Sequence, residues 1–506
     1  ASTSVANNLY GALLYGGKTS EQEVNGTMDF GLNFNLEKLL PGLKASGRVS
    51  LDSYFVGNEV LNNAAATYSR KWLVNDSGEE YVVFEKEKKE NINDDLNLTS
   101  TSTRRAMSWE ANVGYDRTMG LGQFNAMFGY NYLQIEKKGT NQNIQNTNYL
   151  LNLGYVYNDK YIANGTLSYV GSNRFKEGNR YFLSGALALG WIISNETFMR
   201  NSPFDFLKLK ASAGILGYDA NTPFFLYTNR YQNGGNVAFG EENKTSAGST
   251  NWTIVGNDKL KWEKAQEVNI GIEGMTLNKH LSFEVNYFKE LRKDIILKMT
   301  STYSSIYGGY IAYENAGRIS NQGVEVDLRW SDRCGQFQYE VGTNVTWTKN
   351  KVKNDNVLDQ PYDYLNKIGK SSDVIMGYVS QGLFGKDVEL EGHPMQLFGS
   401  YGNGDIAYVD LNDDQVIDER DRKVIGNTFP RTSLGVDLNF KYKGWGLYVL
   451  GTSQLGVDKV LNNRYYWNYG EGKYSVKALE RYHPEYNPNG TMPRLTTSAG
   501  ENNFRD

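Results

Sequence analysis

The sequence predicts an all-β fold, namely a transmembrane antiparallel β-barrel with long extracellular loops. Apolar and polar residues alternate along many segments of about ten residues, these segments pair as hairpins, and short turns alternate with long polar connections. A period of two places successive side chains on opposite faces of a strand. Tilted strands of this length can cross a hydrocarbon layer, and repeated hairpins of this kind are typical of outer-membrane barrels.

The composition agrees with one large barrel. The chain has 506 residues, of which 13% are aromatic, with 36 Tyr, 22 Phe and 53 Gly but only 9 Pro. Tyr and Trp suit the girdle at a membrane interface, because the ring lies in lipid while its polar tip meets water. The mean hydropathy of −0.56 is compatible with a barrel, since only alternate residues face lipid.

Several classes of protein are excluded or disfavoured. The single cysteine, Cys334, rules out an intramolecular disulfide and a cysteine metal cluster, and three widely separated histidines argue against a zinc site. The net charge of −4 provides no basic surface for nucleic acid. The first residues lack the charged and apolar regions of a signal peptide. We therefore expect the chain to be processed or partial.

About fourteen strands are recognisable between an N-terminal segment, residues 1–23, and a loop or tail, residues 457–506. The barrel with its loops is expected to occupy residues 24–456. The predicted strand pairs are 28–36 with 45–56, 107–115 with 124–132, 149–157 with 161–169, 180–194 with 207–217, 262–274 with 281–297, 324–330 with 337–347, and 434–442 with 447–456.

Long polar connections are expected at residues 57–105, 218–260 and 349–431. The charge run Glu85–Asp95 is interpreted as a solvated loop or as a strand extending above the membrane. Alternation of long and short connections is expected of outer-membrane barrels. The alternative is a large soluble all-β protein such as a propeller, whose strands are shorter and whose loops alternate less regularly.

Four segments resemble the SusC/RagA type of TonB-dependent outer-membrane transporters. They are DKLKWEKAQEVNIG at Asp258–Gly271, NAGRISNQGVE at Asn315–Glu325, GDIAYVDLNDDQVIDERDRKVIGN at Gly404–Asn427 with Pro430–Arg431, and GSNRF at Gly171–Phe175. They occur in the family's order and span most of the chain between Tyr149 and Leu455.

The resemblance implies a bacterial outer-membrane protein with a 22-stranded barrel and an N-terminal plug. It also implies energy from TonB–ExbB–ExbD acting through the plug, and a SusD-like surface lipoprotein that closes the mouth as a lid. This chain departs from that pattern, because the sequence contains no recognisable plug, TonB-interacting segment or final strands. We therefore expect part of the barrel to be missing at both ends.

An acidic segment within residues 404–427 has the spacing of a calcium loop. Oxygen ligands at positions 1, 3, 5, 7, 9 and 12 of such a loop would be supplied by Asp410, Asn412, Asp414, the carbonyl of Val416, Asp418 and Asp421. Gln415 replaces the usual glycine, and Asp421 is shorter than the usual glutamate. The alternative is a solvated acidic loop capped by Arg420 and Arg422. No cofactor is required, and bound Ca²⁺ would be structural.

Aromatic clusters in predicted loops are candidates for substrate contact, because flat rings stack on sugars and pack against peptides. The alternative is packing in the interface girdle or within loops. The candidates chosen are Tyr307, Tyr310, Tyr313, Tyr466 and Trp467. No nucleophile–base constellation is present, so we predict that the protein is not an enzyme.

The function that the resemblance implies is TonB-dependent active import of oligosaccharides or oligopeptides, together with a SusD-like lipoprotein. The expected partners are this lipoprotein, the TonB complex, outer-membrane lipid and a glycan or peptide. Two alternatives remain at this point. One is a plug-less passive, structural or adhesive barrel, and the other is a barrel enzyme, which would need a catalytic set near the rim.

Overall fold

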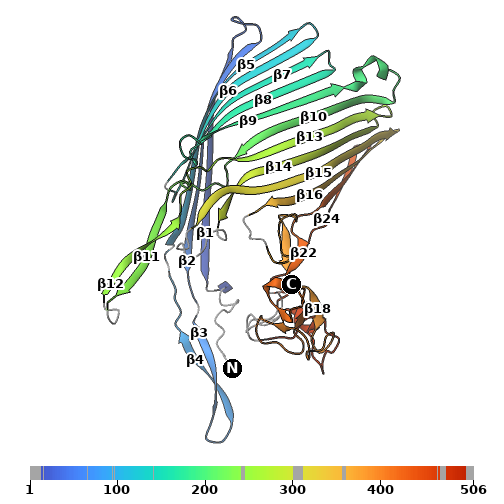
Figure 1. Cartoon of the computed structure of the whole chain (residues 1–506). Coiled ribbons are helices and arrows are strands. Elements are labelled where there is room, and N and C mark those ends of the chain that lie inside the picture. The colour runs from blue at the N-terminus through green and yellow to red at the C-terminus, as the bar shows by residue number, and fades with distance from the viewer. Residues whose placement is uncertain are drawn as a thin grey trace. The chain divides into compact units, whose positions relative to one another are not determined.

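The structure is a computed structural model that describes residues 13–14, 16–64, 66–93, 95, 97–140, 142–240, 245–299, 311–355, 360–463, 465–467 and 475–496. Its main element is a 14-stranded sheet with the order β1-β2-β5-β6-β7-β8-β9-β10-β13-β14-β15-β16-β23-β24 (Figure 1). Each strand of this sheet therefore lies beside the next one in the chain, apart from inserted small strands. This confirms the predicted all-β fold and its fourteen strands.

The bounds of the strands in the large sheet are β1 (Gly17–Asn35), β2 (Leu43–Asn62), β5 (Asn97–Met119), β6 (Gly122–Lys137), β7 (Ile144–Tyr157), β8 (Tyr161–Ser172), β9 (Tyr181–Ile192), β10 (Phe204–Tyr218), β13 (Glu263–Thr276), β14 (Leu281–Met299), β15 (Ala312–Cys334), β16 (Phe337–Asn354), β23 (Thr432–Tyr442) and β24 (Trp445–Leu455). Several are longer than predicted, because polar residues continue a strand beyond its alternating apolar part. The clearest case is β5, predicted as 107–115.

The described residues fall into two compact units. The first comprises residues 1–117, 126–151 and 169–173. In it, β1 and β2 pair in continuous antiparallel register, with Thr27 opposite Asp52. The long connection after β2 contains a hairpin of β3 (Thr67–Val74) and β4 (Glu80–Lys88). The first four residues of the charge run, 85–88, belong to β4 of this separate hairpin, and the described residues that follow are outside it.

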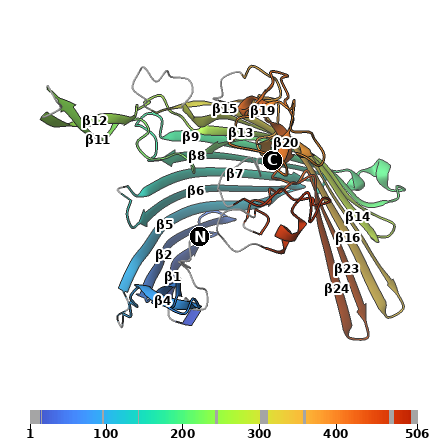
Figure 2. The ribbon, with the colours of Figure 1, turned by 90° about the horizontal axis from the view of Figure 1, so that it is seen from below.

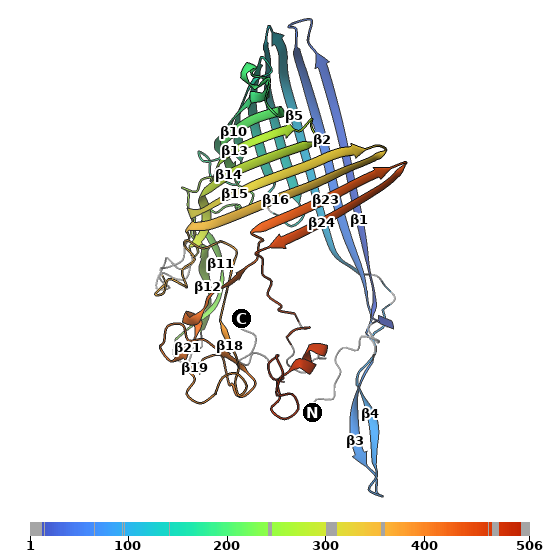
Figure 3. The same cartoon turned by 90° about the vertical axis from the view of Figure 1, so that its right-hand side faces the viewer.

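The second unit comprises residues 118–125, 152–168 and 174–506. Its hairpin β15–β16 sets Val324 opposite Trp347 and Val326 opposite Val345, so apolar side chains share one face. The turn between the strands uses Gly335 at φ 62°, where a residue with a Cβ is disfavoured. Figure 3 shows β15, β16, β23 and β24 following one another across the sheet, in the order that the register gives.

The two faces of these strands differ in polarity. On β9, Leu187, Leu189 and Trp191 are exposed. The opposite face of the neighbouring strands carries ion pairs, in which Lys208 Nζ and Lys210 Nζ each lie 3.0 Å from a carboxylate oxygen of Glu273. A soluble sheet would bury the apolar face. The observed pattern is that of a barrel with lipid outside and water inside.

The long connections contain structure of their own. The predicted loop at residues 218–260 includes a hairpin of β11 (Arg230–Phe239) and β12 (Thr245–Ile254) (Figure 2). The connection between β9 and β10 contains the short 3-10 helices η1 (Ile193–Asn195) and η2 (Thr197–Met199). Among the described residues, no helix is both long and apolar enough to span a membrane.

Candidate functional site

The connection from β16 to β23 folds into a small body together with the segment after β24. We call residues 360–431 and 457–496 the loop domain, within the described ranges. Its short strands are β17 (Val374–Gly377) with β22 (Lys423–Asn427), β18 (Ser380–Leu383) with β20 (Ile406–Tyr408), and β19 (Met395–Gln396) with β21 (Val416–Ile417). The helices η5 (Glu419–Asp421) and η6 (Val476–Glu480) complete it. Its position beyond β16 and β24 can be followed in Figure 3.

The core of the loop domain is aromatic. Tyr408 and Ile417 are fully buried and pack with Tyr378, Leu383, Ile406, Tyr482 and the partly buried Phe398. Tyr482 comes from the segment after β24, and its hydroxyl donates a hydrogen bond to the carbonyl of Gly385 at 2.9 Å. The tail predicted as an irregular loop therefore supplies part of this core.

A buried ion pair fixes the tail to the rest of the loop domain. Asp405 has no exposed surface, and its carboxylate lies 2.7 Å from Arg494 Nε and 2.9 Å from Arg494 Nη2. The backbone N–H of Gly402 donates to the same carboxylate at 2.9 Å. Because Asp405 belongs to the first segment and Arg494 to the second, the pair sets how the two segments meet.

A second ion pair closes the neck where the chain leaves β16 and returns to β23. Arg431 Nη2 lies 3.1 Å from both oxygens of Asp373, which also accept hydrogen bonds from Asn350 Nδ2 and the N–H of Phe429. Burial opposes ionisation of Asp373, but these three donors outweigh it and lower the pKa of the carboxyl group. Arg431 is the arginine of the Pro-Arg motif, so this motif has a structural role at the neck.

A hollow of about 510 Å³ opens between the two segments of the loop domain. Its lining combines an aromatic wall, an aliphatic floor and charged groups. The residues that matter for recognition are Tyr466, Trp467, Leu383, Ile406, Asp387 and Asp458. Leu383 and Ile406 are buried in the core, so the floor is rigid, whereas Lys459 is an exposed cation on the rim.

Backbone contacts fix the two acids of this hollow. One oxygen of Asp387 accepts the N–H of Leu383 at 2.9 Å, and one oxygen of Asp458 accepts the N–H of Asn427 at 3.0 Å. Gly382 adopts φ 114°, and a Cβ there would lie 2.6 Å from Asp387. The hollow therefore offers preset hydrogen-bond acceptors beside flat aromatic rings, which suits a ligand with hydroxyl, amide or amino donors.

The predicted aromatic residues separate in the structure. Tyr466 and Trp467 line this hollow. Tyr313 is half-buried near the start of β15, where its carbonyl accepts a hydrogen bond from Asn257 Nδ2 at 2.9 Å, and it does not line the hollow. Tyr307 and Tyr310 lie outside the described residues. Of the five predicted aromatic residues, Tyr466 and Trp467 are therefore the two that line the hollow.

Sequence reasoning missed Asp387 and Asp458. Neither belongs to a recognisable motif, and they come from segments that lie far apart in the chain. Only the packing of the tail on the loop domain places them around one hollow. No local pattern in the sequence could have identified them.

The acidic segment forms a tight loop, but its carboxylates are already engaged. The side chains of Asp410 and Asp421 accept backbone N–H groups of Gln415, Leu411 and Asp418 at 2.8 Å. The guanidinium of Arg420 lies 2.8 Å from carboxylate oxygens of both Asp414 and Asp418.

This conformation does not present a metal cage. The described part of the chain contains no group of three or more His, Cys, Asp or Glu side chains placed to hold a metal ion. Asn412 donates and accepts hydrogen bonds with Asp414 instead of pointing to a shared centre. Calcium at the six predicted positions stays a prediction, and it requires Arg420 to move away from the loop.

Comparisons with known proteins agree on one family. A family model described as "TonB dependent receptor-like, beta-barrel" matches residues 3–477. The TonB-dependent receptor P26 of Formosa agariphila is 28% identical over 360 residues, which are 68% of this chain and 35% of that protein. The TonB-dependent receptor SusC of Bacteroides thetaiotaomicron is 21% identical over 420 residues, 75% of this chain and 40% of SusC.

Solved structures share the fold. The RagAB peptide importer in its open-open state covers 98% of this chain with a TM-score of 0.72 at 14% identity. The chain covers 54% of that RagAB chain. It thus spans little more than half the length of this structure, and about a third to two fifths of the two curated relatives.

Proposed function

The chain belongs to the TonB dependent receptor-like β-barrel family, and from this premise we propose that it takes part in active import of oligosaccharides or oligopeptides. The family consists of outer-membrane transporters, not enzymes. The chain is accordingly an outer-membrane β-barrel protein. The substrate class, the partners and the energy source are the parts of the proposal that need testing.

The observation that carries the proposal is the hollow of the loop domain. Tyr466 and Trp467 offer flat apolar faces, on which sugar rings or peptide side chains can stack. Asp387 and Asp458 offer acceptors for hydroxyl groups of a sugar or for N–H groups of a peptide. In outer-membrane barrels long loops face the exterior, so we expect this hollow to lie on the side from which a ligand arrives.

We further propose that a SusD-like lipoprotein covers the loops and that a TonB–ExbB–ExbD complex drives release through a plug. Support comes from the similarity to SusC and from the fold shared with the RagAB peptide importer. In the proposed sequence the lipoprotein and the loop domain capture the ligand. Energy-driven displacement of the plug then opens the polar inner face of the sheet to it. No covalent bond changes in this process.

The test uses the full-length protein purified from outer membranes and a panel of labelled oligosaccharides and oligopeptides. The double variant Tyr466→Ala/Trp467→Ala is expected to lose binding of the accepted class. Tyr486→Ala is the matched control, because Tyr486 is a loop-domain tyrosine, 81% exposed, that does not line the hollow. Equal binding by the double variant and the control would refute the site.

Uptake and co-purification test the rest of the proposal. A SusD-like lipoprotein is expected to co-purify, and uptake is expected to stop when the proton gradient across the inner membrane is dissipated. Uptake that continues without the gradient would instead support the passive barrel. Absence of both uptake and ligand binding would leave a structural or adhesive barrel.

A further inference from the structure

The outward face of the second unit contains a groove along β10. The register places Ala211 between Leu189 of β9 and Ile270 of β13, and it places Ala213 between two larger apolar residues one row further along. The methyl groups on β10 are shorter than the side chains on either side. They therefore form the floor of a channel whose walls are Leu189 and Ile270. A hollow of about 750 Å³ includes Ala211 of this floor and extends over β9 and β8 to Tyr155 and Tyr157 of β7.

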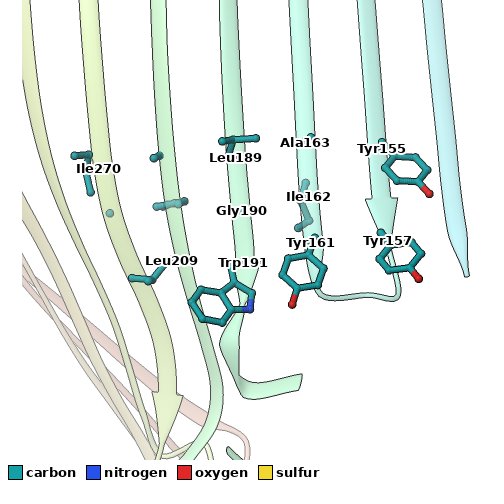
Figure 4. Close-up of a pocket in the computed structure, with 13 residues that line it drawn as sticks. Tyr155, Tyr157, Tyr161, Ile162, Ala163, Leu189, Gly190, Trp191, Leu209 and Ile270 are labelled. Carbon is teal, nitrogen blue, oxygen red and sulfur yellow. The ribbon is translucent and has the colours of Figure 1, made fainter. Parts of the chain in front are cut away.

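The groove is apolar along its length and ends in an aromatic row. Figure 4 shows Trp191, Tyr161 and Tyr157 near the turn ends of their strands, with Leu189 and Ile270 further along. Trp191 and Tyr161 are 36% and 48% exposed, and Leu189 and Ile270 are 52% and 56% exposed. Apolar side chains left this open on a strand face of a membrane protein face hydrocarbon, not water.

Glu196 fixes the aromatic row. Its carboxylate accepts hydrogen bonds from Tyr161 Oη at 2.7 Å and Trp191 Nε1 at 3.2 Å, and it pairs with Lys160 Nζ at 2.9 Å. These contacts lower the pKa of Glu196 to about 2, and the hydrogen bond from Lys160 has the largest effect. The carboxylate therefore stays charged and holds both ring tips at the level of the turn, where tyrosine and tryptophan mark a membrane interface.

An exposed cation lies in the same turn. Arg200 follows η2 in the connection between β9 and β10, four residues after Glu196, and it is exposed. An arginine at this level matches the phosphate of a lipid headgroup. Apolar side chains, interfacial rings and, in the adjoining connection, a cation thus offer partners for the acyl chain, the glycerol region and the phosphate of a phospholipid.

We propose that this groove binds one phospholipid of the leaflet on the short-turn side of the barrel, with an acyl chain over Ala211 and the phosphate at Arg200. The site rests on the outward register and on the outer-membrane location of the family. It does not depend on which substrate the loop domain takes. An acyl chain, which is flexible and apolar, fits this lining, because Lys210, the charged residue in it, has its ammonium group paired with Glu273 and Glu284.

The test uses the full-length protein in detergent, titrated with phosphatidylethanolamine brominated on its acyl chains. Bromine quenches tryptophan on contact. The signal of Trp191, one of nine tryptophans in this chain, is obtained by subtracting the signal of the Trp191→Phe variant. Wild-type protein is expected to show a saturable quench of Trp191. Ala211→Phe, which fills the groove, is expected to lose the saturable component, and Arg200→Gln to require more lipid for half-saturation.

The matched control is Ala111→Phe, an equal enlargement at an exposed position of β5 that does not line the groove. Folding of each variant is judged by heat-modifiable migration in gels. If Ala211→Phe does not fold, Ala163→Leu replaces it, because this change fills the groove from β8. Quenching that rises linearly without saturation, or that is equal in Ala211→Phe and wild type, would show general lipid contact and overturn the site. So would a groove that is covered by a second copy of the chain, detected as a dimer lost in Ala211→Phe.

Discussion

Replacing Arg494 with methionine is expected to loosen the tail of the loop domain. The change removes the charge opposite Asp405, whose side chain has no exposed surface. Removing one partner of a buried ion pair costs about 3–5 kcal/mol. Because 34% of the Arg494 side chain is exposed, water can partly replace it, so we expect a loss near the lower end, about 3 kcal/mol.

Native-state hydrogen exchange measures this loss locally. The reporter amides are those of Arg494, which donates to the carbonyl of Gly404 at 2.8 Å, and Tyr482, which donates to the carbonyl of Met492 at 2.8 Å. A loss of about 3 kcal/mol corresponds to exchange roughly a hundredfold faster. The amide of Thr348, which donates to Arg431 at the neck, is expected to keep its rate.

Lys386→Met provides the matched control. Lys386 Nζ donates to the carbonyl of Gly490 at 3.0 Å, so it joins the same two segments through a long cationic side chain. Its ammonium group faces a carbonyl and the exposed carboxylate of Asp387 at 3.9 Å, instead of a buried carboxylate, and its loss is expected to cost about 1 kcal/mol. If the exchange rates of the reporter amides in Arg494→Met lie within threefold of those in Lys386→Met, the assigned role of the Asp405 ion pair is refuted.

Three further predictions concern other charged groups. Asp373→Asn is expected to destabilise the neck by about 2 kcal/mol. The pKa of Asp373 in the folded protein is lowered from 3.8, so its stabilising contribution is present above pH 3.8 and is lost as pH falls through the lowered pKa. Hydrogen exchange of the Phe429 amide would report this loss. Arg420→Gln is expected to bind Ca²⁺ more tightly than wild type in calorimetric titration, since a competing cation is removed; equal affinities would contradict this. Glu196→Gln is expected to shift the fluorescence of Trp191. Because the pKa of Glu196 is lowered from 4.5 to about 2, the wild-type protein is expected to show the same shift only as pH falls from 4.5 toward 2.

The barrel could be predicted from the sequence because each strand carries its own evidence. Alternation at Val324 and Val326 fixes which face each residue takes, and the structure pairs both residues with apolar partners on β16. Strand ends were less predictable. The polar residues before Met107 continue β5 back to Asn97, since a strand that leaves the membrane no longer needs apolar alternation.

The loop domain could not be predicted because its order comes from contacts between distant segments. The chemistry of Tyr466 and Trp467 makes them ligand candidates in the sequence. The hollow that they line is bounded in part by the tail, which Arg494 and Tyr482 join to the connection before β23. The acidic loop shows the opposite case. Its spacing is local and was recognisable, but Arg420 lies between its carboxylates, and ligand spacing alone does not reveal which cation a loop pairs with.

The strands around β10 serve two environments at once, and this makes the two proposals separable. Successive residues of a strand point to opposite faces, so Ala211 lines the apolar groove while Lys210 joins the ion pairs with Glu273 on the polar face. A ligand with hydroxyl or amide groups would cross on the polar face, and an acyl chain would stay on the apolar one. Ala211→Phe is therefore expected to lose the lipid signal but keep ligand uptake, whereas the Tyr466→Ala/Trp467→Ala variant is expected to lose uptake but keep the lipid signal. If either variant lost both the lipid signal and ligand uptake, the two faces would be coupled, and the assignment of separate sites would fail.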